Sequence, residues 1–286
     1  MAEDSGPPPA RALRAGDTSP RGGESTVVLA VMMPVFNEER TLATILTHVL
    51  ARPEVGEVIA VDDGSTDRSW TILQEFAKKD PRVKPYRLES NQGKGAALRQ
   101  AVTEVSMPFA TVQDADLEYD PRDYPKLLQP LLEGQADAVF GTRGFNGQTA
   151  YNFWFVVGNQ LVTFVCNVLF NCYISDLETG YKVLRSGLWR RLNLSGRRFD
   201  IEPDITVRVL RSGYRIHEVP IRYYARSREE GKKLSWQDGV LAIVALVRLR
   251  VTSTRSMFPQ PDVEYHRQRR QELALRHPLM SPDKPD

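Results

Sequence analysis

Residues 109–118 read FATVQDADLE. Phe109–Gln113 has the short, largely apolar pattern of a buried strand, and two aspartates, Asp114 and Asp116, follow it directly. Carboxylates one residue apart, at a strand end where the chain turns, can converge on one hard cation such as Mg²⁺ or Mn²⁺, often shared with substrate phosphates. Glu118 can add a third oxygen, directly or through a water molecule. The alternative is a set of exposed loop acids, since a lone D-x-D pattern arises by chance in many chains.

Apolar strands alternate with amphipathic helices on both sides of this stretch. The predicted strands are 27–33, 57–61, 82–88, 109–113 and 136–140, and the predicted helices are 41–50, 67–79, 95–105 and 124–132. This alternation predicts an α/β fold with a mostly parallel sheet flanked by helices. Ligands of such sheets bind at the carboxyl ends of the strands, where the two aspartates also fall.

Two other predicted strands end in polar motifs. In MPVFNE (residues 33–38), Phe36 can pack on a nucleobase and Glu38 can bond the base or the ribose. In VDDGSTD (residues 61–67), Asp62 or Asp63 can accept hydrogen bonds from a base or ribose, and Ser65 or Thr66 would cap the next helix. By itself, MPVFNE is equally compatible with a strand end followed by helix-capping acids, and VDDGSTD by itself favours a simple capped turn.

Residues 91–97 read NQGKGAA. Gly93 and Gly95 open a helix and allow close approach of the backbone, and Lys94 offers a positive charge. The spacing is not that of a P-loop, because no Ser or Thr follows the lysine. The motif indicates one wall of a nucleotide site.

The pattern changes after about residue 145. Residues 153–174 are strongly apolar, yet Asn159, Thr163, Asn167 and Asn171 form a polar stripe at helical spacing. A helix at 201–210, a short strand at 215–221 and an amphipathic helix at 236–251 are predicted to follow. The helices predicted at 153–174 and 236–251 can lie in a membrane interface, with Trp154 and Trp236 at headgroup depth, or they can pack on the sheet.

Four motifs in this order, PVFNE, VDDGSTD, NQGKGAA and QDADLEYDP, resemble family 2 glycosyltransferases with the GT-A fold, and most of all the dolichyl- or polyprenyl-phosphate sugar synthases. The resemblance covers roughly residues 27–250. It implies inverting transfer from a UDP- or GDP-sugar with Mg²⁺ or Mn²⁺ as cofactor. It places Asp114 and Asp116 on the metal, and a glutamate, Glu118, stands where such synthases often have glutamine. The residues that would line the nucleotide are Pro34, Phe36, Glu38, Asp62, Asp63, Gly93, Lys94 and Ala115 with the two aspartates.

The resemblance continues into the second half of the chain. Arg143 resembles a phosphate-facing arginine, and the segment with Asp176 and Glu178 resembles an acidic acceptor site, so we expect these three residues to be catalytic together with Asp114 and Asp116. Residues 226–233 resemble a flexible basic loop that closes over phosphates. Its cations are Arg226, Arg228, Lys232 and Lys233. Asp200 and Glu202 are further candidate acids, or else part of an exposed helix face.

Composition limits the remaining possibilities. The chain has 286 residues, 41% hydrophobic residues and a formal net charge of +2, which is typical of a globular protein and does not point to nucleic acid. The two cysteines form no metal-binding or disulfide pattern, and no signal peptide or confident membrane span is visible. We expect a disordered leader (1–25), a GT-A domain (26–252) with a nucleotide-sugar half (26–145) and an acceptor half (146–252), and a polar tail (253–286).

These patterns predict a metal-dependent hexosyltransferase acting on a polyprenyl phosphate, cytoplasmic or peripheral on the cytoplasmic face of a membrane. A lipid phosphate is already anionic near neutral pH and needs cations more than a base. One alternative is a soluble glycosyltransferase that acts on the hydroxyl of a sugar, glycolipid or small molecule. The other is a nucleotide-binding protein that has lost catalysis, against which the intact pair of aspartates argues.

Overall fold

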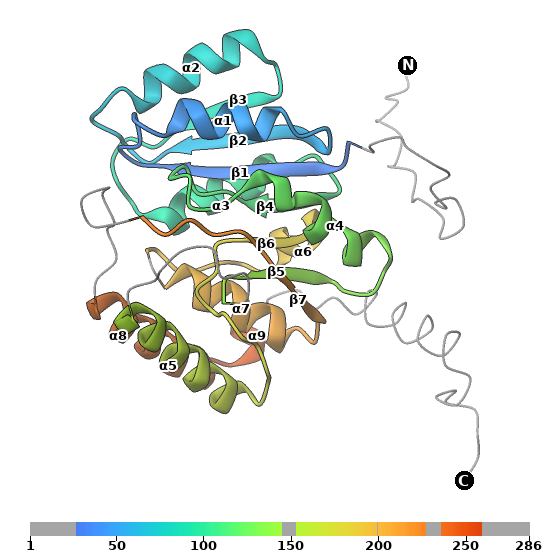
Figure 1. The fold of residues 1–286 in the computed structure, drawn as a ribbon. Coiled ribbons are helices and arrows are strands. Elements are labelled where there is room, and N and C mark those ends of the chain that lie inside the picture. Colours follow the sequence, from blue (N-terminus) through green and yellow to red (C-terminus); the bar gives the residue numbers. More distant parts are fainter. Residues whose placement is uncertain (1–26, 145–152, 199, 227–235, 259–286) are drawn as a thin grey trace, which may run out of the picture.

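The computed structural model describes residues 27–144, 153–198, 200–226 and 236–258. These residues form a seven-stranded sheet in the order β3-β2-β1-β4-β6-β5-β7 (Figure 1). The strands are β1 (Leu29–Val35), β2 (Val55–Asp62), β3 (Val83–Arg87), β4 (Phe109–Val112), β5 (Ala138–Thr142), β6 (Lys182–Arg185) and β7 (Ile216–Pro220). All neighbouring pairs are parallel except those of β6, which runs antiparallel to β4 and β5. The predicted fold class, a mostly parallel sheet flanked by helices, is confirmed.

Helices cover both faces of the sheet (Figure 1). The helices are α1 (Leu42–Leu50), α2 (Ser69–Lys79), α3 (Lys94–Glu104), the short 3₁₀ helix η1 (Pro121–Asp123), α4 (Tyr124–Leu132), α5 (Phe153–Phe170), α6 (Ser186–Arg191), α7 (Ile201–Arg211), α8 (Trp236–Val251) and α9 (Thr254–Met257). One core cluster joins the sheet to α1, α2 and α4, and a second joins its other face to α3, α6 and α7. Burial on both faces explains why the central strands read as continuous apolar runs.

Local sequence explains most of these elements. In α1 the residues Leu42, Ile45, Leu46 and Val49 are fully buried, which is the i, i+3, i+4, i+7 stripe of a helix packed on a sheet.

The predicted cap of α2 is wrong. Its N-cap residue is Arg68, without a side-chain cap. Instead, the Ser65 hydroxyl accepts a hydrogen bond from the Asn37 backbone amide, and the Thr66 backbone amide donates one to the Asn37 side-chain oxygen. These two bonds link the turn after β2 to the segment after β1.

The strand β6 and the helix α6 were not predicted from the sequence. β6 is only four residues long and carries charge at both ends, so it has no alternating pattern that would reveal a strand. Its direction matters for function. Because β6 is antiparallel to β4 and β5, it begins where those strands end. The segment before β6 therefore lies at the carboxyl edge of the parallel strands.

The helices α5 and α8 do not pack on the sheet. They pack against each other, and α8 packs on α7, around a third core cluster that includes Val162, Cys166, Val207 and Leu246 (Figure 1). The helix α5 ends at Phe170, four residues before the predicted end, and Asn171 follows in the left-handed region with φ of 49°. Asparagine tolerates this conformation, which ends the helix.

Candidate active site

A cavity of about 1220 Å³ opens at the carboxyl ends of β1 and β4. The sheet order changes direction at this point, because β2 and β3 continue from one side of β1 and β4 lies on the other. This is the topological switch point at which open α/β sheets bind ligands. The cavity is lined by most of the predicted residues, namely Pro34, Phe36, Glu38, Asp63, Gly93, Lys94, Asp114, Ala115, Asp116, Glu118, Arg143, Asp176, Glu178 and Arg226.

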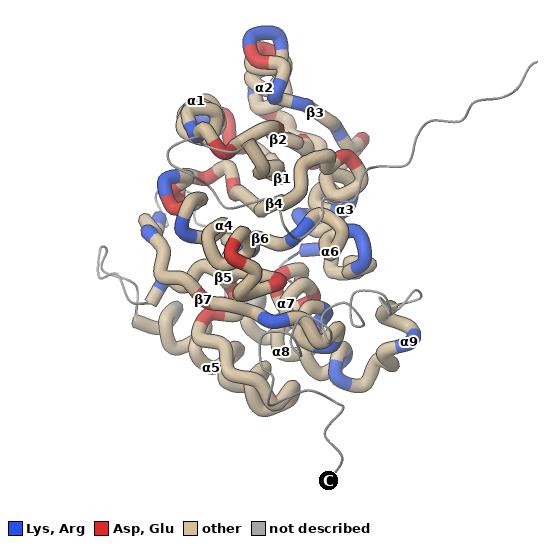
Figure 2. Tube along the Cα trace, turned by 90° about the vertical axis from the view of Figure 1, so that its right-hand side faces the viewer, with Lys and Arg blue, Asp and Glu red and all other residues tan. Residues whose placement is uncertain are grey.

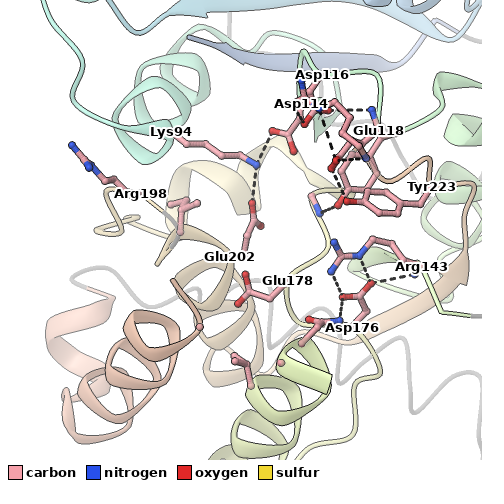
Figure 3. A pocket seen from close by; sticks show the side chains of 18 of the residues that line it. Lys94, Asp114, Asp116, Glu118, Arg143, Asp176, Glu178, Arg198, Glu202 and Tyr223 are labelled. Atoms are coloured by element: carbon pink, nitrogen blue, oxygen red, sulfur yellow. Dashed lines mark hydrogen bonds and ion pairs between the residues drawn. The ribbon is translucent and has the colours of Figure 1, made fainter. Parts of the chain in front are cut away.

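Asp114 and Asp116 lie next to each other in this cavity (Figure 3). The turn after β4 is fixed by Gln113, whose side-chain oxygen accepts hydrogen bonds from the hydroxyls of Tyr124 and Tyr181, both at 2.6 Å. Its side-chain amide in turn donates to the carbonyl of Asp114 at 3.1 Å. The buried tyrosines thus hold the backbone that presents both carboxylates to the cavity.

Each aspartate is paired with a cation from a distant part of the chain. A carboxylate oxygen of Asp114 lies 2.7 Å from Lys94 Nζ, and one of Asp116 lies 3.0 Å from an Arg226 guanidinium nitrogen. Burial and the charges of Asp114 and Glu118 nevertheless raise the pKa of Asp116 to about 7, although Arg226 opposes the shift. The two cations Lys94 and Arg226 here face four carboxylates, those of Asp114, Asp116, Glu118 and Glu38, so acidic groups outnumber basic ones.

This arrangement fits a divalent cation that shares its ligands with a substrate. Within the described residues, no three acidic, histidine or cysteine side chains are grouped to hold a metal by themselves. Two adjacent carboxylates with surplus negative charge match Mg²⁺ or Mn²⁺, because such ions usually take one or two carboxylates and complete their shell with water and phosphate oxygens. Asp114 and Asp116 are the residues that would hold it.

Glu118 lines the cavity beside the aspartate pair, and both of its carboxylate oxygens are hydrogen-bonded within the chain. One carboxylate oxygen accepts a hydrogen bond from the Tyr223 hydroxyl at 2.6 Å, and the other accepts from the Arg226 backbone amide at 3.0 Å. Arg226 also reaches Glu38 at 3.4 Å. Glu118 therefore fixes the start of the basic loop, and Arg226 joins the first motif to the aspartate pair. The other predicted loop cations, Arg228, Lys232 and Lys233, lie outside the described residues.

A chain of alternating charges, half-buried at Asp114 and Lys94 and buried at Glu202, crosses the floor of the cavity (Figure 3). Lys94 lies between Asp114 and Glu202, and Glu202 continues to Lys182, with nitrogen–oxygen distances of 2.9 and 2.8 Å to the two lysines. Lys182 also donates to the carbonyls of Leu177 and Thr179. Burial would lower the pKa of Lys94, but the two carboxylates outweigh it and raise that pKa. Burial alone would raise the pKa of Glu202, yet the two lysines lower it to about 2.

The sequence did not single out Lys182. It left open whether Asp200 and Glu202 are acids of the site or part of an exposed helix face. In the structure, Glu202 and Asp200 have different environments. Glu202 is 6% exposed and lines the cavity, whereas Asp200 accepts hydrogen bonds from the Arg197 and Arg198 backbone amides just before α7. The chain of charges becomes visible only once Lys182, at the start of β6, is seen to be buried. A single sequence does not show that this lysine is buried.

The two aspartates of the second motif also differ. Asp63 lines the cavity, and its carboxylate accepts hydrogen bonds from the Gln92 and Gly93 backbone amides at 2.7 and 2.8 Å. Asp62 is fully buried and pairs with Arg87 at 3.1 Å. Asp62 is not among the residues that line the cavity, so its predicted contact with the nucleotide is replaced by a structural ion pair between β2 and β3.

The glycines of the NQGKGAA motif allow a close backbone contact. Gly93 has φ of 93°, and a Cβ added to Gly95 would lie 2.0 Å from the Gly196 carbonyl oxygen.

We predict that Gly95→Ala lowers the free energy of unfolding by about 2 kcal/mol and weakens nucleotide binding, because α3 must move to relieve this clash. Urea unfolding and nucleotide titration measure both effects. Gly187→Ala in α6 is the control, since a Cβ there meets nothing within 4 Å.

Arg143 and Asp176 form a buried pair at the other end of the cavity (Figure 3). Two guanidinium nitrogens of Arg143 donate to the two Asp176 oxygens, each at 2.8 Å, and the Asn159 side chain of α5 adds a third bond at 3.0 Å. Burial would raise the pKa of Asp176, but Arg143 outweighs it and holds that pKa below its usual value. Asp176 thus stays ionised and positions Arg143, which also stacks on the Tyr223 ring at 5.1 Å.

Glu178 has a different electrostatic environment, although it is only two residues from Asp176. Its Oε1 atom is buried and has no hydrogen-bond partner among the described residues. Burial and the nearby charge of Glu202 raise the pKa of Glu178 to about 7. The expected acidic pair therefore contains one anchored carboxylate and one that can exchange a proton near neutral pH.

The raised pKa of Glu178 predicts a pH-dependent stability. The unfolded carboxyl loses its proton near its ordinary pKa of 4.5 and the folded one near 7, so folding becomes less favourable as pH rises between these values. We expect Glu178→Gln to remove this penalty and to be more stable than the native chain at pH 8, by on the order of 2 kcal/mol, with no gain at pH 4. Urea unfolding at both pH values tests this, and an equal effect at both would contradict it.

The open α/β sheet and the charged cavity at its switch point define an α/β protein with a ligand site at the carboxyl ends of its strands. The chain belongs to glycosyl transferase family 2, whose family model matches residues 30–190. It is therefore a glycosyltransferase of this family.

Individual relatives agree with this assignment. The chain is 30% identical to the low-salt glycan biosynthesis hexosyltransferase Agl6 of Haloferax volcanii, over 74% of this chain and 51% of that protein. It is 27% identical to a dolichol-phosphate mannosyltransferase of Pyrococcus furiosus, over 71% of this chain and 58% of that protein. It thus spans only between half and three fifths of these two relatives.

The fold is also that of a solved glycosyltransferase. Glucosyl-3-phosphoglycerate synthase from Mycobacterium tuberculosis, crystallised with Mn²⁺, uridine-diphosphate and phosphoglyceric acid, superimposes with a TM-score of 0.61. The match covers 79% of each chain at 19% identity, so it establishes the fold alone. The same neighbour has also been crystallised with Mg²⁺ and uridine-diphosphate.

Proposed function

We propose that the chain transfers a hexose, with inversion, from a UDP- or GDP-sugar to a polyprenyl phosphate. The observation that carries this proposal is the composition of the cavity along its length. One end holds the aspartate pair and its cations, and the other is walled by Trp154 and Leu161 of α5 and by Val240 and Ile243 of α8. A charged end that continues into an apolar wall suits an acceptor with a phosphate head and a hydrocarbon tail.

The donor would lie between the first three motifs and the aspartate pair. Phe36 offers a ring to the base, and the loop held by Asp63 forms the adjacent wall. A divalent ion at Asp114 and Asp116 would supply charge stabilisation for the departing nucleotide. Lys94 and Arg226 already contact these two carboxylates, so both cations are placed to neutralise the diphosphate once a donor is present.

The acceptor would enter from the α5 and α8 side. A phosphate oxygen is already anionic near neutral pH, so attack on the anomeric carbon opposite the diphosphate needs orientation and positive charge more than a base. Arg143 is fixed by Asp176 and lines this part of the cavity, which suits it to hold the acceptor phosphate. Residues 26–145 would thus form the nucleotide-sugar half and residues 146–252 the acceptor half.

The outer surface of α5 supports attachment to a membrane. Its polar stripe faces inward, where Asn159 bonds Asp176, the Thr163 hydroxyl accepts from the Leu177 amide, and Asn167 bonds Ile174. The large apolar residues lie away from this stripe and are exposed, and two of them, Trp154 and Leu161, also line the open cavity. Trp154, Leu161, Phe164 and Val168 are between 53% and 75% exposed. Figure 2 shows α5 without a charged residue along its length. A helix that exposes its apolar face beside a lipid-binding cavity fits a membrane interface.

The contact we propose is peripheral, on the cytoplasmic face. None of the helices in the described part of the chain is long and apolar enough to cross a bilayer. Insertion of α5 and α8 to headgroup depth would bring the apolar end of the cavity to the lipid. The acceptor could then reach Arg143 without its tail leaving the membrane.

A donor screen tests the proposed reaction. Nucleotide release is measured for a panel of UDP- and GDP-sugars with Mg²⁺ or Mn²⁺, with and without a polyprenyl phosphate. We expect one donor to be turned over, faster by at least about tenfold when the lipid phosphate is added. Binding of nucleotide without turnover under any of these conditions would show a non-catalytic nucleotide-binding protein instead.

A second candidate acceptor is a hydroxyl group, and Glu178 is the observation that favours it. A hydroxyl must lose a proton during attack, and a carboxylate with a pKa of about 7 is suited to accept it near neutral pH. Glu178→Gln distinguishes the two acceptors. Turnover with a hydroxyl acceptor should fall by about 100-fold or more, whereas turnover with a lipid phosphate should change by less than about fivefold.

A further inference from the structure

A second hollow of about 850 Å³ lies between α3 with the loop before it, the segment of Arg197, Arg198 and Asp200, and α8. Its lining contains four guanidinium groups and one carboxylate. These are Arg99, Arg197, Arg198, Arg248 and Asp200. An excess of arginine around one hollow favours a phosphate-bearing ligand, because guanidinium groups match phosphate oxygens in charge and geometry.

Two of these arginines are available to a ligand. Arg197 and Arg198 are exposed, and within the described residues their guanidinium groups have no hydrogen bond or ion pair. Arg99 is partly used, since it donates to the Gly196 carbonyl at 2.6 Å. Arg248 lies 3.6 Å from Asp200 and is itself 57% exposed. The single carboxylate thus neutralises only one of the four cations.

The hollow is adjacent to the active-site cavity and opens beside an apolar surface. Asn91 and Arg198 line both spaces, and in Figure 3 Arg198 lies apart from the acidic cluster, on the side of Lys94. The helix α8 contributes Leu241 and Val244 to the rim of the second hollow, with 57% and 58% of their surface exposed. The apolar surface then continues over Val240, Val247 and Val251 to the neighbouring α5.

We propose that this hollow is a headgroup site for an anionic phospholipid of the membrane to which the protein attaches. The juxtaposition of uncompensated arginines with exposed aliphatic residues matches a phosphate joined to acyl chains, whereas a soluble phosphate would leave the aliphatic rim exposed. The site is separate from the acceptor site, because α8 directs Val240 and Ile243 to one space and Leu241 and Arg248 to the other. The inference rests on the proposed membrane attachment, and it fixes which face of α8 meets the lipid.

Vesicle binding of matched variants tests this site. The full chain is sedimented with phosphatidylcholine vesicles that contain phosphatidylglycerol, and with pure phosphatidylcholine vesicles. Arg197 and Arg248 do not line the active-site cavity, so Arg197→Gln with Arg248→Gln should leave donor turnover without lipid unchanged. This double variant should bind the anionic vesicles roughly 25-fold more weakly, at about fivefold per arginine.

Lys78→Gln with Lys79→Gln is the control. It removes the same charge from the exposed end of α2, on the far side of the sheet from α8 (Figure 1), and should lose less than twofold. Equal binding of the arginine variant and the native chain would overturn the proposal. So would equal binding of the native chain to neutral vesicles, or complete displacement by glycerophosphate at constant ionic strength, which would indicate a site for a free phosphate.

The same protein preparation separates this inference from the proposed reaction. Donor turnover is measured beside vesicle binding. Absence of turnover with arginine-dependent vesicle binding would contradict the reaction and support the headgroup site. Turnover with vesicle binding that ignores the arginines would support the reaction and overturn the headgroup site.

Discussion

Replacing Asp116 by asparagine is expected to lower turnover by at least about 100-fold while the chain stays folded. The substitution keeps the shape of the side chain and removes one of the two carboxylates that would hold the divalent ion. Burial and the charges of Asp114 and Glu118 together outweigh the ion pair with Arg226 and raise the pKa of Asp116, so we expect loss of its negative charge not to destabilise the fold. Nucleotide release at saturating Mg²⁺ and Mn²⁺ measures the first effect, and urea unfolding measures the second.

Asp80→Asn is the matched control for this substitution. Asp80 is paired with Arg82 at the end of α2 and is not among the residues that line the cavity, so turnover should stay within about twofold of the native value. Native turnover of Asp116→Asn at saturating metal would overturn the assignment of the aspartate pair. A loss of turnover accompanied by unfolding would show a structural role for Asp116 instead.

Replacing Asp176 by asparagine is expected to have the largest effect on stability, a loss of about 3 kcal/mol at pH 7. Asp176 and Arg143 have 4% and 17% of their side chains exposed. Removing the carboxylate leaves the buried arginine without this counter-charge. The contribution of Asp176 should be complete above its ordinary pKa of 3.8 and should be lost as pH falls below it, because its pKa in the folded chain is lowered.

Urea unfolding at pH 7 and pH 3 tests this prediction against a surface pair. Arg122→Gln removes the partner of Asp120, but Arg122 is 64% exposed, so we expect a loss of less than about 1 kcal/mol. A similar small loss for Asp176→Asn would mean that Arg143 does not depend on this carboxylate. Turnover of Asp176→Asn with a lipid phosphate should also fall, since Arg143 would no longer be held in place.

The four sequence motifs were sufficient to predict the fold and the location of the cavity. Three of the motifs join a buried strand to the turn that follows it, whereas NQGKGAA opens the helix α3, and the carboxyl ends of parallel strands meet at one edge of the sheet. Adjacent residues within a motif were not distinguished in this way. Asp62 and Asp63 have the same local pattern, yet one pairs with Arg87 inside the sheet and the other faces the cavity. Asp62 is the last residue of β2 and Asp63 begins the turn after it, and the packing of β3 and of the 92–93 backbone decides which partner each carboxylate meets.

The local sequence determined most of the segments that become strands and helices, because burial on one or both faces goes with a periodic apolar pattern that each of these segments carries by itself. The short elements β6 and α6 lack such a pattern and are exceptions. Only the tertiary structure decided which charges meet. Lys182 reaches Glu202, Lys94 reaches Asp114, and Arg226 reaches Asp116 across 20 to 110 residues of chain. It also decided that α5 turns its polar stripe inward, since the Asp176 segment offers partners that only the folded chain brings to it. Pairing over such separations depends on the packing of β6, α7 and α8 and leaves no periodic trace in the sequence.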